Sequence, residues 1–220
     1  MTEHAADRHY LPAMGHDRLL PLYDALTRLA GVRRAHARLL DGAGLAAGQV
    51  VLEIGCGTGN LTLAAKRRRP DVAVTGLDPD PRALDAAHRK ATRAGVDVQF
   101  VRGFADALPM ADGSVDRVLS SLMLHHLDDH VGGNLGDGEK DRALREVHRV
   151  LRPGGELHLL DFGGSAVPTT ARGHGGRVAD NAGDRIPRRL RAAGFTEVAE
   201  IAQVRLRVPG GRCAVFRALR

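Results

Sequence analysis

A short apolar run followed by three closely spaced glycines constrains the fold of this chain more than any other feature. The run is Val50–Ile54, with one acid, Glu53, near its end, and the next residues are Gly55-Cys56-Gly57-Thr58-Gly59. Such a run is typical of a buried parallel strand. Glycines then allow a tight turn and a close approach of the backbone to a ligand. The stretch therefore predicts a strand, a turn and a helix that starts at the turn.

A second predicted strand completes a nucleoside-binding pattern. It covers residues 72–78 and ends at Asp78, nineteen residues after Gly59. An acid at this place can accept hydrogen bonds from ribose hydroxyls. The spacing Gly-x-Gly-x-Gly differs from the Gly-x-Gly-x-x-Gly of a dinucleotide fold, and Glu53 would repel a pyrophosphate. An acid suits an ammonium or a sulfonium, and S-adenosylmethionine carries both cations and no phosphate.

These stretches resemble class I S-adenosylmethionine-dependent methyltransferases, over roughly residues 20 to 160 and by pattern only in the C-terminal quarter. The resemblance implies a Rossmann-like, three-layer αβα fold, with a seven-stranded, mostly parallel sheet that ends in an antiparallel hairpin. The competing interpretation is an ordinary βα turn with an aspartate at a strand end. The residues that the resemblance assigns to cofactor binding are Tyr23, Glu53, Gly55, Cys56, Gly57, Gly59, Asn60, Asp78, Pro79, Phe104, Ala105, Asp106, Ser121 and Leu122.

The rest of the pattern predicts a single domain, in which residues 1–48 form an N-terminal helical cap and residues 49–220 bind the cofactor. Helices are expected at 17–29, 33–40, 61–69, 81–94, 138–151 and 185–193. Further strands are expected at 96–101, 115–121, 156–162, 196–208 and 212–219, the last two joined as a hairpin through Pro209-Gly210-Gly211.

Residues 163–181 show no periodic pattern. A segment of this length is usually either a functional loop or disordered. Because it follows the fifth strand, it starts beside the expected cofactor cleft, and we predict that it forms part of the acceptor pocket. A solvated linker is the alternative.

The stretch from Gly103 to Pro109 resembles the family segment that covers the adenine. The acid usual in that segment directly follows the glycine, whereas here Phe104 takes that position and Asp106 comes two residues later. Two interpretations remain open. Asp106 reaches the adenine amino group, or the Ala105 amide contacts the ring while Phe104 packs against it. We favour the second.

Two adjacent histidines follow the fourth predicted strand, in the segment that the resemblance places between the cofactor and the acceptor. His125 and His126 point to opposite sides if the strand geometry continues. Either is a candidate general base, because the unperturbed pKa of histidine lies near working pH. The alternatives are a solvent-facing or capping histidine, and a transfer in which alignment of the acceptor with the S–CH₃ bond replaces a protein base.

Composition narrows the classes of partner. The net charge of +6 invites a nucleic-acid role, but the chain has no tryptophan, two tyrosines, and lysine only at Lys66, Lys90 and Lys140. Stacking on unpaired bases normally uses aromatic rings, so nucleic acid is an unlikely partner. We expect no metal, because the acidic set of catechol-type enzymes is missing. We expect no membrane span either, because no window approaches eighteen apolar residues.

Two cysteines make neither a disulfide framework nor a zinc site, and the N-terminus carries no apolar signal region. We therefore expect a cytoplasmic enzyme, monomeric or homodimeric, that transfers a methyl group from S-adenosylmethionine to a small molecule. The resemblance is strongest to quinone C-methyltransferases and secondary-metabolite enzymes. The alternatives are an RNA or protein methyltransferase and a non-catalytic S-adenosylmethionine-binding protein.

Overall fold

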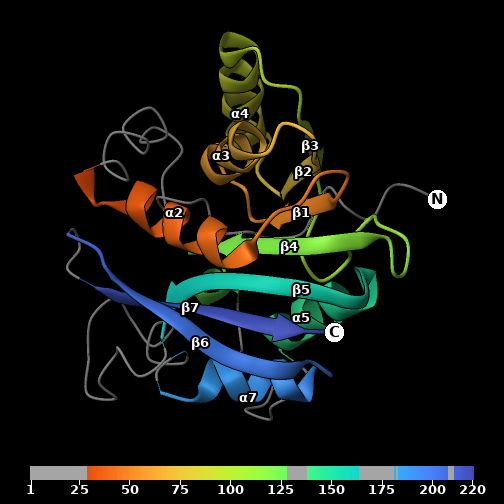
Figure 1. Ribbon diagram of the computed structural model, residues 1–220, viewed down its shortest axis with the longest axis vertical. Helices are drawn as coiled ribbons and strands as arrows, with labels where there is room; N and C mark the ends of the chain where they lie inside the picture. Colours follow the sequence, from red (N-terminus) through yellow and green to blue (C-terminus); the bar gives the residue numbers. More distant parts are fainter. Residues whose placement is uncertain (1–28, 128–137, 164–180, 182, 208–210) are drawn as a thin grey trace.

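The strands of the described part of the chain form one seven-stranded sheet in the order β3-β2-β1-β4-β5-β7-β6 (Figure 1). The computed structural model describes residues 29–127, 138–163, 181, 183–207 and 211–220. The strands are β1 (Val50–Ile54), β2 (Ala73–Asp78), β3 (Gln99–Arg102), β4 (Val115–Ser121), β5 (Leu151–Phe162), β6 (Thr196–Arg205) and β7 (Arg212–Leu219). The helices are α2 (Val32–Ala43), α3 (Asn60–Arg68), α4 (Pro81–Ala94), α5 (Glu139–Val150) and α7 (Arg185–Ala192), with a 3₁₀ turn η2 (Leu124–His126).

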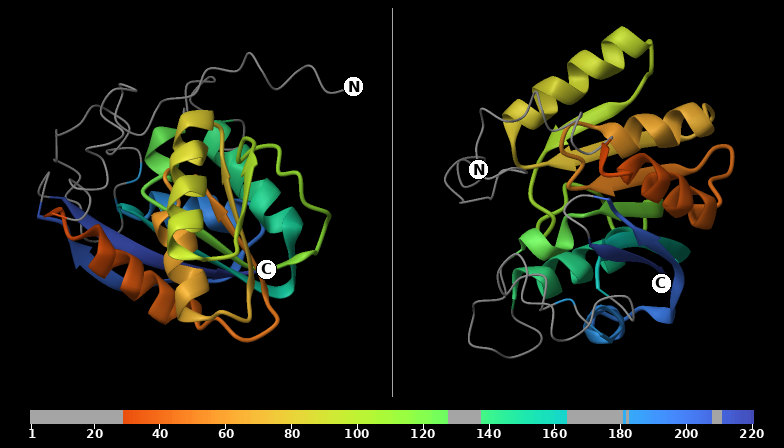
Figure 2. Two further views of the ribbon diagram at one scale, coloured as in Figure 1. Left: turned by 90° about the horizontal axis from the view of Figure 1, so that it is seen from above. Right: turned by 90° about the vertical axis from the view of Figure 1, so that its left-hand side faces the viewer.

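Crossover connections place the helices on two faces of the sheet. β1 pairs in parallel with both β2 and β4, and the pairs β2–β3 and β4–β5 are also parallel. Right-handed crossovers from β1 toward β3 put α3 and α4 on one face, and the crossover from β4 to β5 puts α5 on the other. Helix α2 lies on the side of α3, and α7 on the side of α5 (Figure 2). The predicted three-layer architecture is confirmed.

Each face has its own hydrophobic core, because side chains alternate along a strand. On β5, Leu157 and Leu159 belong to the core beneath α5 and α7, whereas Leu160 belongs to the core beneath α2 and α3. On β7, Phe216 and Val215 divide in the same way. The strands at the centre of the sheet are therefore apolar on both sides, as the continuous apolar runs of the sequence predict.

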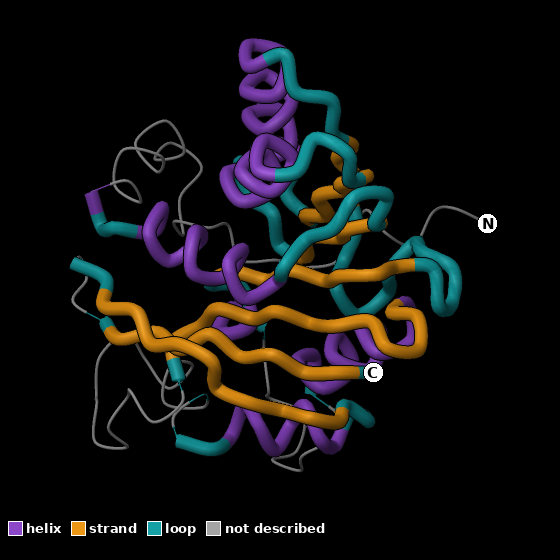
Figure 3. Tube along the Cα trace, in the orientation of Figure 1, coloured by secondary structure: helices purple, strands orange, loops and turns teal. Residues whose placement is uncertain are grey.

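The last two strands complete the sheet in the antiparallel sense. β7 pairs with β5 on one side and with β6 on the other, antiparallel to both. Figure 3 shows these long strands side by side. The expected C-terminal hairpin is confirmed, although Pro209 and Gly210 of its connection lie outside the described residues.

Two expected strand boundaries were wrong, for identifiable reasons. Strand β3 starts at Gln99 rather than residue 96, because Val96 donates its N–H to the Ala91 carbonyl and so belongs to the end of α4. Strand β5 starts at Leu151 rather than residue 156. Leu151 pairs with Val115 and Glu156 pairs with Arg117, so residues 152–155 form a bulge inside the strand instead of ending it.

Several predictions concern residues outside the described ones. They include Tyr23, the helix over 17–29 and most of the segment 163–181. Of the cap predicted for residues 1–48, the structure describes α2, which packs against β5 and β7. No helix among the described residues has both the length and the apolar character needed to cross a bilayer.

Candidate active site

Three parallel strands bring candidate residues to one edge of the sheet. Ile54 pairs with Leu77 on β2 and with Ser120 on β4. The residues that follow these three, Gly55, Asp78 and Ser121, therefore lie at the same level of the sheet. In open α/β sheets, ligands bind at this carboxyl edge.

The glycine turn after β1 has left-handed backbone conformations that favour glycine. The φ angles of Gly55, Gly57 and Gly59 are 66°, 51° and 76°. A Cβ atom at Gly55 would overlap the Met123 side chain, and one at Gly59 would overlap Ala87 and Phe100. At Gly57, by contrast, a Cβ would meet no described atom within 4 Å. The turn is thus packed on both flanks and open at its centre, as a cradle for a ligand requires.

Asp78 is held against this opening by two backbone amides. Gly57 donates its N–H to Asp78 Oδ2 at 2.7 Å, and Asp80 donates its N–H to Oδ1 at 3.0 Å. Burial raises the pKa of Asp78 to about 6, although both hydrogen bonds act in the opposite direction. Each carboxylate oxygen has a further lone pair available to a ribose hydroxyl.

Glu53 lies behind the turn, against α3. Thr62 on α3 donates its hydroxyl to Glu53 Oε2. Burial raises the pKa of Glu53 to about 8, because the charged form loses its hydration. The described side-chain partner of Glu53 is thus Thr62 on α3, and contact of Glu53 with a cofactor cation stays a prediction.

Other residues assigned to the cofactor brace the turn from outside. Cys56 donates its N–H to the Leu77 carbonyl at 3.0 Å, and Asn60 Oδ1 accepts from Lys90 on α4 at 2.9 Å. The Pro79 carbonyl accepts from Arg102 Nε at 3.2 Å. These bonds tie the turn to β2 and α4, and the end of β2 to β3, so the neighbouring elements fix the shape of this edge.

The adenine segment is joined to the same edge. Gly103 donates its N–H to the Asp78 carbonyl at 3.2 Å. Asp106 accepts from Arg142 Nε on α5 at 3.3 Å. Because Asp106 is thus directed toward α5, this geometry favours the interpretation in which the Ala105 amide and Phe104 contact the adenine.

The end of β4 has a strained backbone. Leu122 has φ 55°, a left-handed conformation that is uncommon for leucine, and donates its N–H to the Leu160 carbonyl at 2.7 Å. Ser121 Oγ lies 3.0 Å from His36 Nε2 on α2. Burial lowers the pKa of His36 to about 4, so this ring is neutral at neutral pH. Such strain persists where the surroundings fix the chain, often at a functional site.

The prediction that His125 and His126 point to opposite sides was wrong. The strand ends at Ser121, and the two residues belong to the 3₁₀ turn η2. Their ring centroids lie 4.2 Å apart with the planes tilted by 39°. The alternation of a strand therefore does not reach them, and the rings lie side by side.

Asp161 is a site residue that the sequence analysis missed. It lies on β5, is fully buried, accepts the backbone N–H of His125, and has its Oδ1 2.8 Å from the ring Nδ1 of the same residue. A signal was available: Asp161 is an acid near the end of an apolar strand, the same position that identified Asp78 on β2.

The fold and this site define a Rossmann-like nucleoside-binding protein of the methyltransferase type. Residues 51–155 match a family model described as a methyltransferase domain. The demethylmenaquinone methyltransferase of Thermus thermophilus is 36% identical over 147 residues, which cover 66% of this chain and 62% of the relative. The 27-O-demethylrifamycin SV methyltransferase of Amycolatopsis mediterranei is 36% identical over 148 residues, which cover 66% of this chain and 48% of the relative.

A solved structure agrees in fold. A phosphoethanolamine N-methyltransferase of Haemonchus contortus, in complex with phosphomonomethylethanolamine and S-adenosylhomocysteine, gives a TM-score of 0.74 at 15% identity and covers 94% of this chain and 58% of that one. Residues 51–155 therefore carry a methyltransferase domain of the class I, S-adenosylmethionine-dependent type. The chain spans between about half and two thirds of the length of the curated relatives named above.

Proposed function

We propose that this chain binds S-adenosylmethionine at the glycine turn and transfers its methyl group to a small-molecule acceptor. The observation that carries the proposal is the 2.7 Å bond between the Gly57 amide and Asp78 Oδ2, beside the open space in front of Gly57. A turn that has no side chain at its centre, next to a fixed carboxylate, can bind a nucleoside with a cationic tail at this edge.

Different residues would contact different parts of the cofactor. Asp78 would bind the ribose hydroxyls, the Ala105 amide and Phe104 would contact the adenine, and the space in front of Gly57 would hold the methionine arm. When bound, S-adenosylmethionine supplies an activated methyl group and leaves as S-adenosylhomocysteine. Holding the acceptor in line with the methyl group is the main task left to the protein.

The names of the relatives favour a small-molecule acceptor, and buried polar atoms at the carboxyl edge favour one that carries hydrogen-bonding groups. The names of the two relatives indicate acceptors related to a quinone and to rifamycin. At the carboxyl edge of the sheet, Ser120 Oγ and both side-chain polar atoms of Asn181 are buried and have no hydrogen-bond partner among the described residues. Such atoms are costly unless a ligand or water pairs with them.

The remaining predictions complete the proposal. His125 or His126 is the general base, residues 163–181 contribute to the acceptor pocket, no metal takes part, and the protein is a cytoplasmic monomer or homodimer. Both cysteines are free and buried, which supports a reducing compartment.

Two measurements test the proposal. Calorimetric titration of the full chain with S-adenosylhomocysteine should show binding at one site, and loss of binding in Gly57→Val, whose side chain fills the open space. Incubation with methyl-labelled S-adenosylmethionine and either demethylmenaquinone or a small-metabolite extract should label a small molecule. Binding without any transfer would indicate a non-catalytic protein, and label only in RNA or protein would contradict the proposed acceptor class.

A further inference from the structure

The buried carboxylate of Asp161 holds residue 125 at two points. His125 Nδ1 lies 2.8 Å from Asp161 Oδ1, and the His125 backbone N–H donates to Oδ2 at 3.2 Å. Asp161 Oδ1 also accepts the backbone N–H of Phe162 at 2.7 Å. The carboxylate is fully buried, whereas the His125 side chain keeps 14% of its surface exposed. A buried group thus orients one that reaches the surface of the described structure.

We propose that Asp161 is a positioning residue that fixes the tautomer and the ring orientation of His125, and that it thereby makes His125, rather than His126, the base of the reaction. The inference rests on the methyl transfer proposed above for its chemical meaning. Its structural part, the state of the His125 ring, stands independently of that function.

The tautomer follows from the hydrogen-bonding capacity of the two groups. A carboxylate that receives N–H groups acts only as an acceptor, so its partner on the neutral ring must be the protonated nitrogen. Nδ1 therefore carries the hydrogen, and Nε2 keeps a lone pair that can take a proton. The opposite tautomer would place two acceptors against each other at 2.8 Å.

The orientation of the ring is fixed by contacts on two sides in addition to the carboxylate. Phe162 meets the His125 ring edge-on, with centroids 5.1 Å apart and an interplanar angle of 78°. The His126 ring lies 4.2 Å away. Because the carboxylate binds both the ring and the backbone of residue 125, rotation of the ring would break the bond to Nδ1. Nε2 is consequently held on the side of the ring away from β5.

The proposed step is a proton transfer coupled to methyl transfer. The acceptor's O–H or N–H proton moves to His125 Nε2, while the acceptor's electron pair forms the new bond to the methyl carbon. The bond from that carbon to sulfur breaks, and its electron pair stays on sulfur. The imidazolium is stabilised by Asp161 until the proton passes to water. This is the division of work between an orienting carboxylate and a histidine base in other enzymes.

The first test needs neither an acceptor nor an altered Asp161. Long-range ¹H–¹⁵N correlation spectra of the ¹⁵N-histidine-labelled full chain report the tautomer of each ring, and the signals of His125 are assigned as those missing in His125→Gln. We expect the neutral His125 ring to show protonated Nδ1 and unprotonated Nε2. A neutral ring protonated at Nε2 overturns the proposal.

The second test compares two buried aspartates. In Asp161→Asn and Asp161→Ala, the preference of His125 for protonated Nδ1 should be lost. Asp141→Asn is the matched control, because Asp141 is also buried and pairs with Arg189 at 2.7 Å on other elements. It should lower the melting temperature without altering the His125 tautomer. An unchanged tautomer in both Asp161 variants, or the same change in Asp141→Asn, contradicts a specific positioning role.

The third test separates the inference from the proposed function. Once an acceptor is found, Asp161→Asn should lower kcat by on the order of 10²-fold or more, with unchanged affinity for S-adenosylhomocysteine. His126→Gln should lose at least tenfold less activity than His125→Gln. Absence of turnover in the wild type would refute the proposed function and leave the tautomer result standing. Normal kcat in an Asp161→Asn protein with an altered tautomer would refute the positioning role.

Discussion

Two histidine–carboxylate pairs in the described structure include a residue of strand β5, and they differ in their position in the sheet, their exposure and their neighbouring charges. His158 Nε2 lies 2.9 Å from Glu156 Oε2 inside the sheet, where Glu156 pairs with Arg117 and His158 with Leu119 of β4. The pair of His125 and Asp161 lies at the carboxyl edge, with a similar separation of 2.8 Å. The separation alone therefore does not tell which pair has a function.

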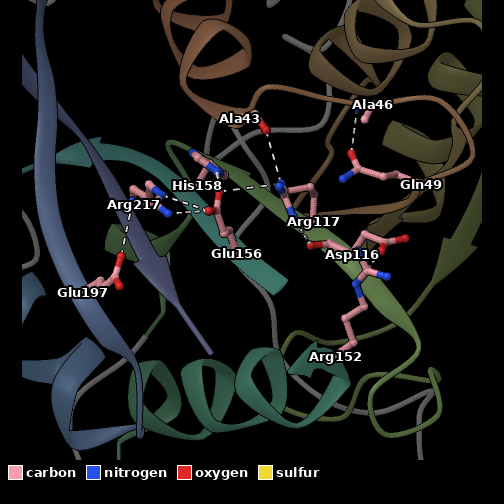
Figure 4. A network of polar contacts seen from close by, with 10 residues as sticks. All are labelled: Ala43, Ala46, Gln49, Asp116, Arg117, Arg152, Glu156, His158, Glu197 and Arg217. Carbon is pink, nitrogen blue, oxygen red and sulfur yellow. Dashed lines mark hydrogen bonds and ion pairs between the residues drawn. The ribbon is translucent and has the colours of Figure 1, made fainter. Parts of the chain in front are cut away.

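The surroundings of the first pair indicate a structural role. Arg217 donates to Glu156 Oε1, Arg117 lies 3.6 Å from Oε2, and Glu197 extends the network (Figure 4). His158 is fully buried, and its pKa is lowered by burial and by the two arginines despite the bond to Glu156. A neutral, enclosed ring in a network of ion pairs links β4, β5 and β7 but offers nothing to a substrate.

The second pair occupies the edge at which the glycine turn and Asp78 also lie. Its histidine is on a turn rather than inside a strand, and it retains exposed surface. The comparison teaches that location in the sheet decides the role of a histidine–carboxylate pair. Strand interiors hold such pairs for stability, and the carboxyl edge presents them to ligands.

The largest expected effect comes from exchanging the two histidines for glutamine. His125→Gln should lower kcat by about 10²- to 10⁴-fold, the range for loss of a general base. His158→Gln should leave kcat per folded molecule unchanged while it lowers the free energy of unfolding. Steady-state kinetics combined with urea unfolding measures both. Equal losses of kcat in the two variants would contradict the distinction between the carboxyl edge and the strand interior.

The next effect compares two strand aspartates at opposite ends. Asp78→Ala should weaken binding of S-adenosylhomocysteine by about 1.5–3 kcal/mol, the range for hydrogen bonds to a charged group. Asp116 is the control, since its Oδ2 accepts the Val50 N–H at 2.7 Å near the start of β1. Asp116→Ala should reduce stability and leave the affinity intact. Calorimetric titration decides, and an unchanged affinity in Asp78→Ala would remove Asp78 from the site.

A smaller effect concerns two glutamates with opposite pKa shifts, the buried Glu53 and the partly buried Glu156. Burial raises the pKa of Glu53 to about 8. Burial also acts to raise the pKa of Glu156, but the hydrogen bonds from Arg217 and His158 outweigh it and hold that pKa below its usual value. Because folded Glu53 keeps its proton longer than the unfolded chain does, its contribution to stability declines as the pH rises from about 4.5 to 8. The contribution of Glu156 is instead lost as the pH falls from the ordinary glutamate pKa to the lower pKa of the folded state.

Urea unfolding at pH 8, at pH 5 and at a pH below the ordinary glutamate pKa of 4.5 separates the two contributions. Glu53→Gln should flatten the decline toward pH 8 by on the order of one to a few kcal/mol, since one pKa unit corresponds to about 1.4 kcal/mol. Glu156→Gln should lose most stability at neutral pH and little below the ordinary glutamate pKa. If Glu53→Gln keeps the pH dependence of the wild type, Glu53 is not the protonated buried group.

The parts of the fold that local patterns determine could be predicted. The apolar run, the glycines and Asp78 predict the first βαβ unit because strand, turn and acid lie within thirty residues of one another. The start of β5 could not be predicted. Pro153 and Gly154 favour the end of an element, and only the pairing of Leu151 with Val115 extends the strand across them.

The half of the site for which we propose a catalytic role depends on contacts between distant segments. Asp161 and His125 are 36 residues apart, so nothing in either local stretch predicts their bond. The side-by-side arrangement of His125 and His126 could not be predicted either, because the strand ends at Ser121 and both residues belong to the 3₁₀ turn η2. Strand alternation is a sound rule only as far as the strand continues.

The central claim is that ligands bind at the carboxyl edge of the sheet and that the network around His158 in the strand interior is structural. Titration of the ¹⁵N-labelled chain with S-adenosylhomocysteine, followed through backbone amide signals, tests it most directly. The amides of Gly57 and Asp80, which both donate to Asp78, should shift strongly, and those of Val50 and Arg117 should stay in place. Strong shifts around Arg117, Glu156 and His158 with an unchanged Gly57 signal would contradict the account.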